Sequence, residues 1–440
     1  MKKILSIILS CFACCMQVCL ATGNDITVSI TTTEYGQVEA LLAEAEAGNA
    51  TNIIVAGPID ESDFQALNKY AVKGKYNVVD LQGAEIKDNT VPDLAFCGPF
   101  VSKDRLYLGI KKIILPEGIV KIGKWAFAFT ELEEINIPSS LRELGDNAFL
   151  RDTCLNCPIV LPEGVEEIGD NTFNQCFKLS IPPVLPSTLK RIGEWAFAYT
   201  TFKTIEFNDG LEYMGYAAFF YSGLEEVILP NSIVELGGGT FALSEGLRHA
   251  SLPASMKDII WDIFRDCTSL QKVDIPEGVK SIGNSAFDRC KMLKEIMLPS
   301  TLESIEPTAF ESCPIQTIDF PAHLKYLGYN CFARTNLRTI YCESLTPPEF
   351  QTSLNPFDEA CYANAVVYVH FGCKEKYQEH WGWCKFKNIV ETDEFPLAGI
   401  SDAMGAPDEH ALYDLQGRKV SQPLPGRVYI QNGKKVVLSE

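Results

Sequence analysis

The sequence is poor in the residues and motifs on which most enzyme chemistry depends. Only five of its 440 residues are histidines, and these are scattered. It contains no HExxH, GxSxG, P-loop or GxGxxG motif. Acidic pairs such as Glu133 and Glu134 recur at one position of a repeat, as at a solvated edge, whereas a glycosidase needs two facing carboxylates. We therefore expect a protein without catalytic residues, cofactor or bound metal.

The sequence also lacks basic runs and, beyond its N-terminus, long apolar stretches. It has 57 acidic against 38 basic residues and a formal net charge of −19. Such a surface repels nucleic acid and anionic membranes, which favours neutral, cationic or calcium-bridged partners. No segment beyond residue 21 approaches the ~20 apolar residues of a membrane-spanning helix. We expect neither a nucleic-acid partner nor a transmembrane segment.

The one pronounced apolar segment lies at the N-terminus and has the order of a secretory signal. Two lysines precede the apolar residues Ile4–Leu9, and Cys19-Leu20-Ala21 forms a small-residue cleavage site. Residues 1–21 are therefore predicted to be removed on export. A competing reading is a bacterial lipobox ending at Cys11, which would carry a lipid anchor, but the short apolar stretch and Leu9 fit that pattern poorly.

One spacing recurs ten times along the chain: a proline, then a phenylalanine eleven residues later. Asn208 replaces the proline once, and successive units are 22 to 24 residues long. The phenylalanines are Phe127, Phe149, Phe173, Phe197, Phe219, Phe241, Phe264, Phe287, Phe310 and Phe332. A fixed period in the twenties indicates a solenoid, which typically offers a binding surface rather than a pocket.

Each repeat has an internal order that predicts its local structure. Apolar residues alternate before the proline, which indicates a strand with one buried face that the proline then ends. A glycine follows seven residues after the proline in eight of the ten units, which indicates either positive φ or a close backbone approach. A short helical turn such as Trp125-Ala126-Phe127 is expected next, with the phenylalanine in the core. Each coil thus adds one parallel strand to a sheet.

These units resemble the leucine-rich repeats of the BspA-like family of exported bacterial surface proteins. Stretches such as LPEGVEEIGDNTFNQCFKL and IPEGVKSIGNSAFDRCKML carry the resemblance, which covers roughly residues 50–341. Residues 52–85 resemble the family's N-terminal strand-helix-strand cap, and residues 342–391 its closing segment. The resemblance implies a repeat solenoid, capped at both ends, that functions in adhesion or host interaction.

The C-terminal residues resemble the sorting tails of type IX secretion, through Tyr413–Arg418, Gly426, Tyr429-Ile430 and Gly433-Lys434. Alternating apolar runs around a Pro-Gly turn predict a small β-hairpin. The expected organisation is a signal peptide at 1–21, an N-terminal cap at 22–108, ten repeats at 109–341, a C-terminal cap at 342–394, and a linker with the tail at 395–440.

Twelve cysteines remain after the predicted cleavage. Cys176, Cys267, Cys290 and Cys313 each lie three residues past a repeat phenylalanine, which predicts a ladder of small buried residues. Cys154 and Cys157 have a CxxC spacing without a second CxxC or a nearby histidine pair, so a disulfide or free thiols are expected there rather than zinc.

A second group of cysteines and histidines lies in the C-terminal cap. His370, Cys373, His380 and Cys384 fall within fifteen residues. The alternatives are a zinc site, a Cys373–Cys384 disulfide, which suits an exported protein, and residues without a shared role.

The best candidate binding surface is the outward face of the strand before each proline. Its residues two before the proline, together with one residue four before it, form exposed columns in this prediction, apolar toward one end and acidic toward the other. They are Ile114, Asn136, Val160, Val184, Glu206, Ile228, His249, Ser251, Asp274, Met297 and Asp319. The alternative is that β-propensity alone selects the apolar members, or that a flanking segment covers them.

We expect the face to bind a protein or glycan partner, host extracellular matrix among the candidates, at the cell surface or outside the cell. A scaffold in the periplasm or cell envelope with an internal partner is the alternative.

Overall fold

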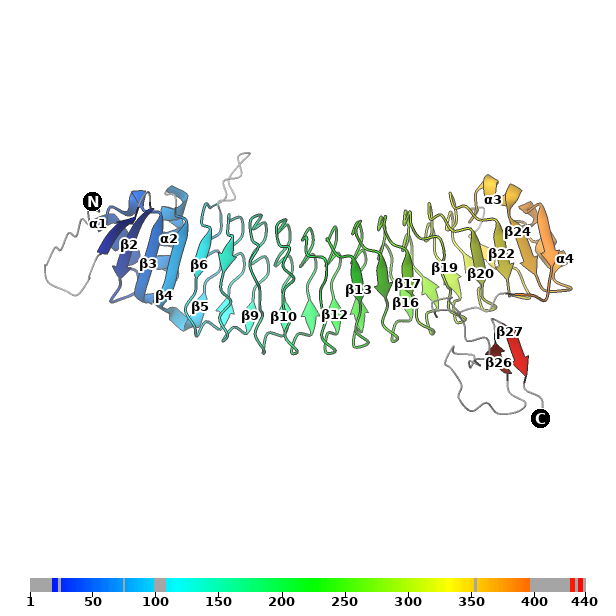
Figure 1. The fold of residues 1–440 in the computed structure, drawn as a ribbon, viewed down its shortest axis with the longest axis horizontal. Coiled ribbons are helices and arrows are strands. Elements are labelled where there is room, and N and C mark those ends of the chain that lie inside the picture. The colour runs from blue at the N-terminus through cyan, green and yellow to red at the C-terminus, as the bar shows by residue number, and fades with distance from the viewer. Residues whose placement is uncertain are drawn as a thin grey trace. The chain divides into compact units, whose positions relative to one another are not determined.

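The computed structural model describes residues 18–22, 25–73, 76–98, 108–351, 354–395, 428–431 and 434–437. The chain divides into two compact units, one ending at Leu247 and one beginning at Arg248. Both are repeat solenoids of short parallel strands (Figure 1). Each unit is described by itself.

The first unit opens with a helix-covered sheet that starts the solenoid. Its elements are β1 (Val18–Thr22), β2 (Asp25–Thr31), α1 (Val38–Glu44), η1 (Ala47–Asn49), β3 (Asn52–Ile59), α2 (Glu61–Lys73), β4 (Val78–Ile86) and η2 (Lys87–Asn89). The strand order is β1-β2-β3-β4-β6-β8, in which β6 (Lys112–Ile114) and β8 (Glu134–Ile135) belong to the first repeats. β3, α2 and β4 form the strand-helix-strand order that the sequence resemblance implied. The sheet of the cap therefore continues without interruption into the first repeats.

The buried Asp63 holds the two cap helices in place. One of its carboxylate oxygens accepts the N–H of Val38 at 2.9 Å, and the other accepts those of Gly36 and Asp60 at 2.8 and 3.0 Å. These donors belong to the starts of α1 and α2, whose first N–H groups have no partner within the helix. A single carboxylate therefore caps both helices.

The repeats of the first unit form two parallel ladders. Strands before the proline are β6 (Lys112–Ile114), β8 (Glu134–Ile135) and β13 (Glu226–Ile228). Strands after it are β7 (Lys121–Ile122), β9 (Glu143–Leu144), β10 (Glu167–Ile168), β11 (Arg191–Ile192), β12 (Tyr213–Met214) and β14 (Glu235–Leu236). β5 (Thr90–Val91), which lies ahead of the first repeat, pairs with β7 and begins this ladder.

The second unit repeats this arrangement. Before the proline lie β15 (His249–Ser251), β17 (Lys272–Asp274) and β20 (Thr317–Phe320). β22 (Thr339–Cys342), β24 (Val366–Val369) and β25 (Asn388–Glu391) extend the ladder of β20. After it lie β16 (Asp258–Ile259), β18 (Ser281–Ile282), β19 (Ser304–Ile305), β21 (Tyr326–Leu327) and β23 (Glu349–Phe350). The cap adds α3 (Glu359–Asn364), α4 (Lys374–Glu379) and η3 (Trp383–Lys385).

The expectation of a single sheet was therefore incomplete. The ladder after the proline is the continuous one, from β5 to β14 in the first unit and from β16 to β23 in the second. The predicted ladder before the proline is interrupted between β8 and β13, where it is reduced to an isolated bridge between Val160 and Val184. Pro182 and Pro183 stand directly before Val184, and proline has no N–H to donate to a ladder.

The segment around each phenylalanine is not the helical turn that the sequence predicted. No helix occurs in the described residues 108–351. Instead, the residues two before and two after the phenylalanine have positive φ, between 53° and 63° in every coil from Trp125 to Arg334. This alternation turns successive N–H groups toward the next coil, whereas a helix would direct them into its own backbone.

These turns form a third inter-coil ladder. Phe127 donates its N–H to Ala148 at 2.8 Å, while Trp125 and Phe129 donate to the same next coil at 3.1 and 2.9 Å. The pattern recurs at each coil within a unit. Every N–H donor of this ladder bonds to the coil that follows it in the chain. Since no repeat coil follows the last one, its N–H groups need acceptors from the cap.

The C-terminal cap supplies these acceptors. Asn330 and Phe332 donate to the carbonyl oxygens of Asn355 and Pro356 at 2.9 Å each. Arg334 donates its N–H to a carboxylate oxygen of Asp358 at 2.8 Å. The other oxygen of Asp358 accepts the N–H of Cys361 at 2.9 Å and caps α3. One aspartate therefore ends the ladder and starts the cap helix.

The repeat phenylalanines form the core of each unit as a column of stacked rings. In the first unit, rings from Phe96 to Phe241 follow one another with centroids 5.2–6.1 Å apart. In the second, the column from Phe264 to Phe357 has spacings of 5.1–5.8 Å. The ten repeat phenylalanines are fully buried. Each stacked pair adds about 0.5–1.5 kcal/mol to the stabilisation from buried area.

The repeat glycines are required by close approach, which decides between the two alternatives that the sequence left open. None of the eight has positive φ. A Cβ on Gly215 would lie 2.6 Å from the backbone nitrogen of Glu194, and one on Gly237 would lie 2.2 Å from that of Tyr216. The backbones of successive coils pack too closely there for any side chain.

The C-terminal tail contains a hairpin, formed by β26 (Val428–Gln431) and β27 (Lys434–Val437), at another place than the predicted Pro-Gly turn. The strands are antiparallel and their register pairs Gln431 with Lys434. The connection therefore falls at residues 432–433. The Pro-Gly pair at 425–426, which was expected to form the turn, lies outside the described residues.

We predict that Gly215→Ala will destabilise the first unit by about 1–3 kcal/mol, because overpacking forces the backbone apart. Gly109→Ala is the matched control, since a Cβ there meets nothing within 4 Å. Urea unfolding monitored by circular dichroism compares the two. An equal effect of both substitutions would contradict the close-approach argument.

Candidate functional site

The predicted strand face of the first unit contains three clearly exposed apolar side chains. Val160, Val184 and Ile228 are 53%, 56% and 61% exposed. No described segment therefore covers them. Val160 and Val184 lie outside any regular strand, so a preference for strand geometry alone accounts poorly for these two residues.

Other predicted members of this face in the first unit have different surroundings. Glu206 is exposed, whereas Ile114 is half-buried. The side-chain amide of Asn136 both accepts the N–H of Leu115 and donates to its carbonyl, at 2.7 and 2.9 Å. Asn136 thus replaces main-chain ladder bonds beyond the end of β8, which is a structural role.

In the second unit, two predicted residues from neighbouring strands contact one another. His249 Nε2 lies 2.7 Å from a carboxylate oxygen of Asp274, and Lys272 lies 2.8 Å from the other oxygen. Burial opposes ionisation of Asp274, but hydrogen bonds from Lys272 and His249 outweigh it and lower the pKa of the carboxyl. Ser251, beside them on β15, is half-buried.

The remaining two predicted residues differ in exposure. Met297 is exposed, as expected. Asp319 was predicted to be exposed but is half-buried, and one of its oxygens is buried with no hydrogen-bond partner in the described part of the chain. Burial, with a smaller contribution from Glu343, raises its pKa to about 6. Because it is half-buried, Asp319 is not part of an open column, although a carboxyl with a pKa of about 6 is still largely ionised at neutral pH.

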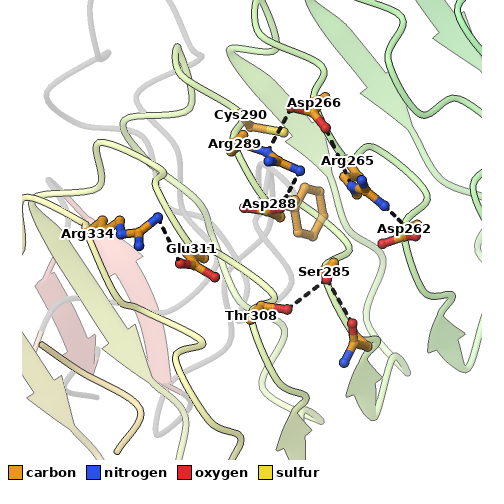
Figure 2. Close-up of polar contacts among 12 residues, drawn as sticks. Asp262, Arg265, Asp266, Ser285, Asp288, Arg289, Cys290, Thr308, Glu311 and Arg334 are labelled. Carbon is orange, nitrogen blue, oxygen red and sulfur yellow. Dashed lines mark hydrogen bonds and ion pairs between the residues drawn. The ribbon is translucent and has the colours of Figure 1, made fainter.

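The turn face of the second unit, formed by the three turn ladder residues of each coil and their neighbours, is charged (Figure 2). Arg265 lies 3.2 Å from Asp262 and 3.5 Å from Asp266. Arg289 lies 2.9 Å from Asp266 and 3.2 Å from Asp288. Burial raises the pKa of Asp288 to about 6, although Arg289 lowers it. Of these ion pairs, the one between Arg289 and Asp266 links successive coils, so its first effect is structural.

The same positions of the first unit carry aromatic side chains. The ring centroid of Trp195 lies 5.5 Å from that of Tyr216 and 5.0 Å from that of Phe220. The ring centroids of Tyr199 and Tyr221 are 5.3 Å apart. Trp195 and Tyr199 have positive φ, a conformation that bulky residues rarely adopt and Asn adopts readily. We call these five residues the aromatic cluster. The cluster is not predicted from the sequence, because the repeat pattern indicates a helical turn there and singles out only the repeat phenylalanine.

The cysteine ladder is confirmed as a set of small buried residues. Cys176, Cys267, Cys290 and Cys313 are fully buried and are not joined in disulfides. The thiols of Cys290 and Cys313 lie 3.2 and 3.0 Å from carbonyl oxygens of the preceding coil. Burial raises the pKa of Cys176 and Cys290 well above its usual range, which disfavours the reactive thiolate. Cys154 and Cys157 are also free thiols.

The cysteines and histidines of the C-terminal cap do not come together. His370 packs against Phe395, with ring centroids 4.2 Å apart, and Nδ1 of His380 accepts the N–H groups of Gly382 and Trp383. Cys373 and Cys384 are both free thiols. Across the described ranges, no three His, Cys, Asp or Glu side chains are placed to hold a metal ion. The disulfide and zinc alternatives are therefore absent from this part of the structure.

Asp152 occupies the same ladder position as the cysteines, so a carboxyl stands where the other coils have a small buried side chain. It is fully buried. One oxygen accepts hydrogen bonds from the N–H and hydroxyl of Thr130, and the other has no partner among the described residues. Burial raises the pKa of its carboxyl well above the usual range, although the bonds from Thr130 oppose this.

We predict that Asp152→Asn will change how stability depends on pH. Above about pH 4 the unfolded carboxyl ionises while the buried one keeps its proton, so the wild-type protein loses stability as the pH rises toward the folded pKa. The amide loses no proton. Urea midpoints between pH 4 and pH 8 should favour the variant increasingly as the pH rises, and parallel profiles would contradict the prediction.

None of the described helices is both long and apolar enough to cross a membrane.

Comparison with known sequences identifies the repeats. The family model "BspA type Leucine rich repeat region (6 copies)" matches residues 107–183, 182–276 and 258–352, which is more than half of the chain. No curated protein matches the sequence.

Several solved structures are similar. A leucine-rich repeat protein from Bacteroides ovatus has 21% identity over 78% of this chain and 99% of its own, with a TM-score of 0.54. A leucine rich cell surface protein from Faecalibacterium prausnitzii has 18% identity over 88% and 96%, with a TM-score of 0.39. The pneumococcal vaccine antigen PcpA has 17% identity over 86% and 97%, with a TM-score of 0.31. At 21% identity the similarity to the Bacteroides ovatus structure extends to the fold alone.

Proposed function

Because the chain belongs to the family of BspA-type leucine-rich-repeat proteins, we propose that it is an exported, non-enzymatic protein that binds a protein or glycan partner. The signal-like residues 1–21 support export, and the sorting-like tail supports delivery to the cell surface. The repeats supply a broad surface, and enzyme motifs are lacking in the sequence. Adhesion or host contact is the role we favour, with extracellular matrix among the candidate ligands.

The observation that carries the proposal is the exposure of Val160, Val184 and Ile228 on the strand face. Side chains of this kind are costly to leave in water, and grouped on one face they mark interaction sites. Glu206 adds negative charge beside them, and the chain as a whole has a net charge of −19. The strand face of the first unit therefore suits a partner with an apolar contact area and a neutral or basic rim.

Protease shaving of intact cells tests the location. We expect the full chain to be cleaved from the surface, and a chain truncated after Pro396 to be protected, because the tail is proposed to direct export. If the full chain resists protease until the outer envelope is opened, the surface role is wrong. The periplasmic or envelope scaffold with an internal partner then replaces it.

Substitution of the three exposed apolar residues on the strand face tests the proposed binding surface. The triple variant Val160→Thr, Val184→Thr, Ile228→Thr keeps β-branched shape while removing apolar contact. Binding to immobilised extracellular-matrix proteins and neutral polysaccharides should fall at least about tenfold, since interface contacts of this kind contribute about 1 kcal/mol or more each.

Val120→Thr combined with Val234→Thr is the matched control, because both valines are exposed at 39% and 85% but follow the proline. Its binding should be unchanged. A further variant, Tyr199→Ser with Tyr221→Ser, addresses the aromatic cluster. Loss of binding in that variant alone would move the site from the strand face to the turn face.

A further inference from the structure

Among the residues that the structure describes, the outer edge of the N-terminal sheet is covered only by β1, whose residues nearly all belong to the predicted signal peptide. β1 pairs antiparallel with β2 and matches Val18 with Ser29 and Thr22 with Asp25. Predicted cleavage after Ala21 removes every residue of β1 except Thr22. In the mature chain β2 then becomes the edge strand of this sheet.

The hydrogen-bonding groups of β2 alternate between its two sides. Ile26 accepts the N–H of Thr51 at 2.8 Å, and its own N–H reaches the hydroxyl of Thr51 at 2.9 Å. Ile26, Val28 and Ile30 therefore direct their main-chain groups toward β3. Thr27 and Ser29 direct theirs toward β1. Cleavage leaves these outward groups without their antiparallel partner.

β2 carries none of the features that usually protect an edge. Its sequence, DITVSIT, has no lysine, no proline and no break in the strand, and its only charge is at the first residue. The last strand of the C-terminal cap differs. β25 has four residues and ends in Glu391, whose carboxylate is held by the N–H of Gly372 at 2.8 Å. Natural edges are normally short or charged in this way.

We propose that signal cleavage converts the β2 edge into a self-association site, at which a second copy of the chain adds its own β2 antiparallel. The position of β1 supports this occupant, since an antiparallel strand already fits there. Antiparallel pairing of two identical strands is also the arrangement that a two-fold axis produces.

The sequence of β2 is complementary to itself in one register. With the two-fold axis at Val28, Ile26 faces Ile30 of the second copy and Thr27 faces its Ser29. Val28 and Ile30 are buried in the first copy, where α1 packs on β2. Apolar residues thus meet apolar ones on the helix-covered face, and hydroxyl residues meet on the other. The register also brings together the outward main-chain groups of Thr27 and Ser29.

The test compares two forms of the full-length exported chain. The mature chain from Thr22 to Glu440 should shift from monomer to twice that mass as its concentration rises, measured by light scattering after size-exclusion chromatography. A chain that begins at Val18 retains β1 and should remain monomeric under the same conditions. A mature chain that is monomeric up to millimolar concentration would overturn the proposal.

A variant of the mature chain tests the edge itself. Ser29→Pro removes an outward N–H and leaves the bonds to β3 in place, so it should abolish the dimer, and Ser29→Thr should preserve it. Thr27→Lys is a second blocking variant in case proline disturbs folding, which circular dichroism monitors. A dimer that survives both blocking variants would place self-association elsewhere.

N-terminal mass spectrometry of the exported protein decides whether the edge is opened in the cell. A first residue at Thr22 is expected. A lipid-modified Cys11 would keep β1 in place and overturn the proposal, without affecting the proposed partner binding at the strand face.

Discussion

The structure depends on the way each coil donates three main-chain hydrogen bonds to the next coil around a buried phenylalanine. Positive φ at the residues two before and two after the ring turns the N–H groups along the solenoid. The rings stack at the spacing that this ladder imposes, close to 5 Å. Hydrogen bonding and aromatic packing therefore require the same distance between coils, and each reinforces the other.

This constraint explains residues that look unrelated in the sequence. The coil spacing leaves no room for a Cβ at Gly215 or Gly237. It also gives the turn ladder a direction along the chain, so the last coil is left with N–H donors that no further coil accepts. Asp358 satisfies the last of them and begins the cap helix with its other oxygen. A solenoid built on such a ladder needs a cap with acceptors, and hydrophobic cover alone is insufficient.

The constraint also separates the surfaces available for function. Residues within the three ladders are held by main-chain geometry, and those that face the core are fixed by packing. The strand face and the turn face remain free to vary. The first unit has exposed valine and isoleucine on one and aromatic rings on the other, whereas the same turn positions in the second unit carry linked arginines and aspartates. The proposed partner binding rests on the exposed valine and isoleucine of the strand face in the first unit.

The sequence by itself determined the repeat architecture, the buried phenylalanines and the buried cysteines, because these follow from a spacing that is constant along the chain. The geometry of the turn and the second ladder after the proline were decided only by tertiary structure. Short segments take their conformation from hydrogen bonds to neighbouring coils, and the local sequence pattern does not predict those bonds. The same holds for individual residues. Asp319 and Asn136 occupy outward positions in the pattern, but burial of the first and ladder bonds of the second depend on segments distant in sequence.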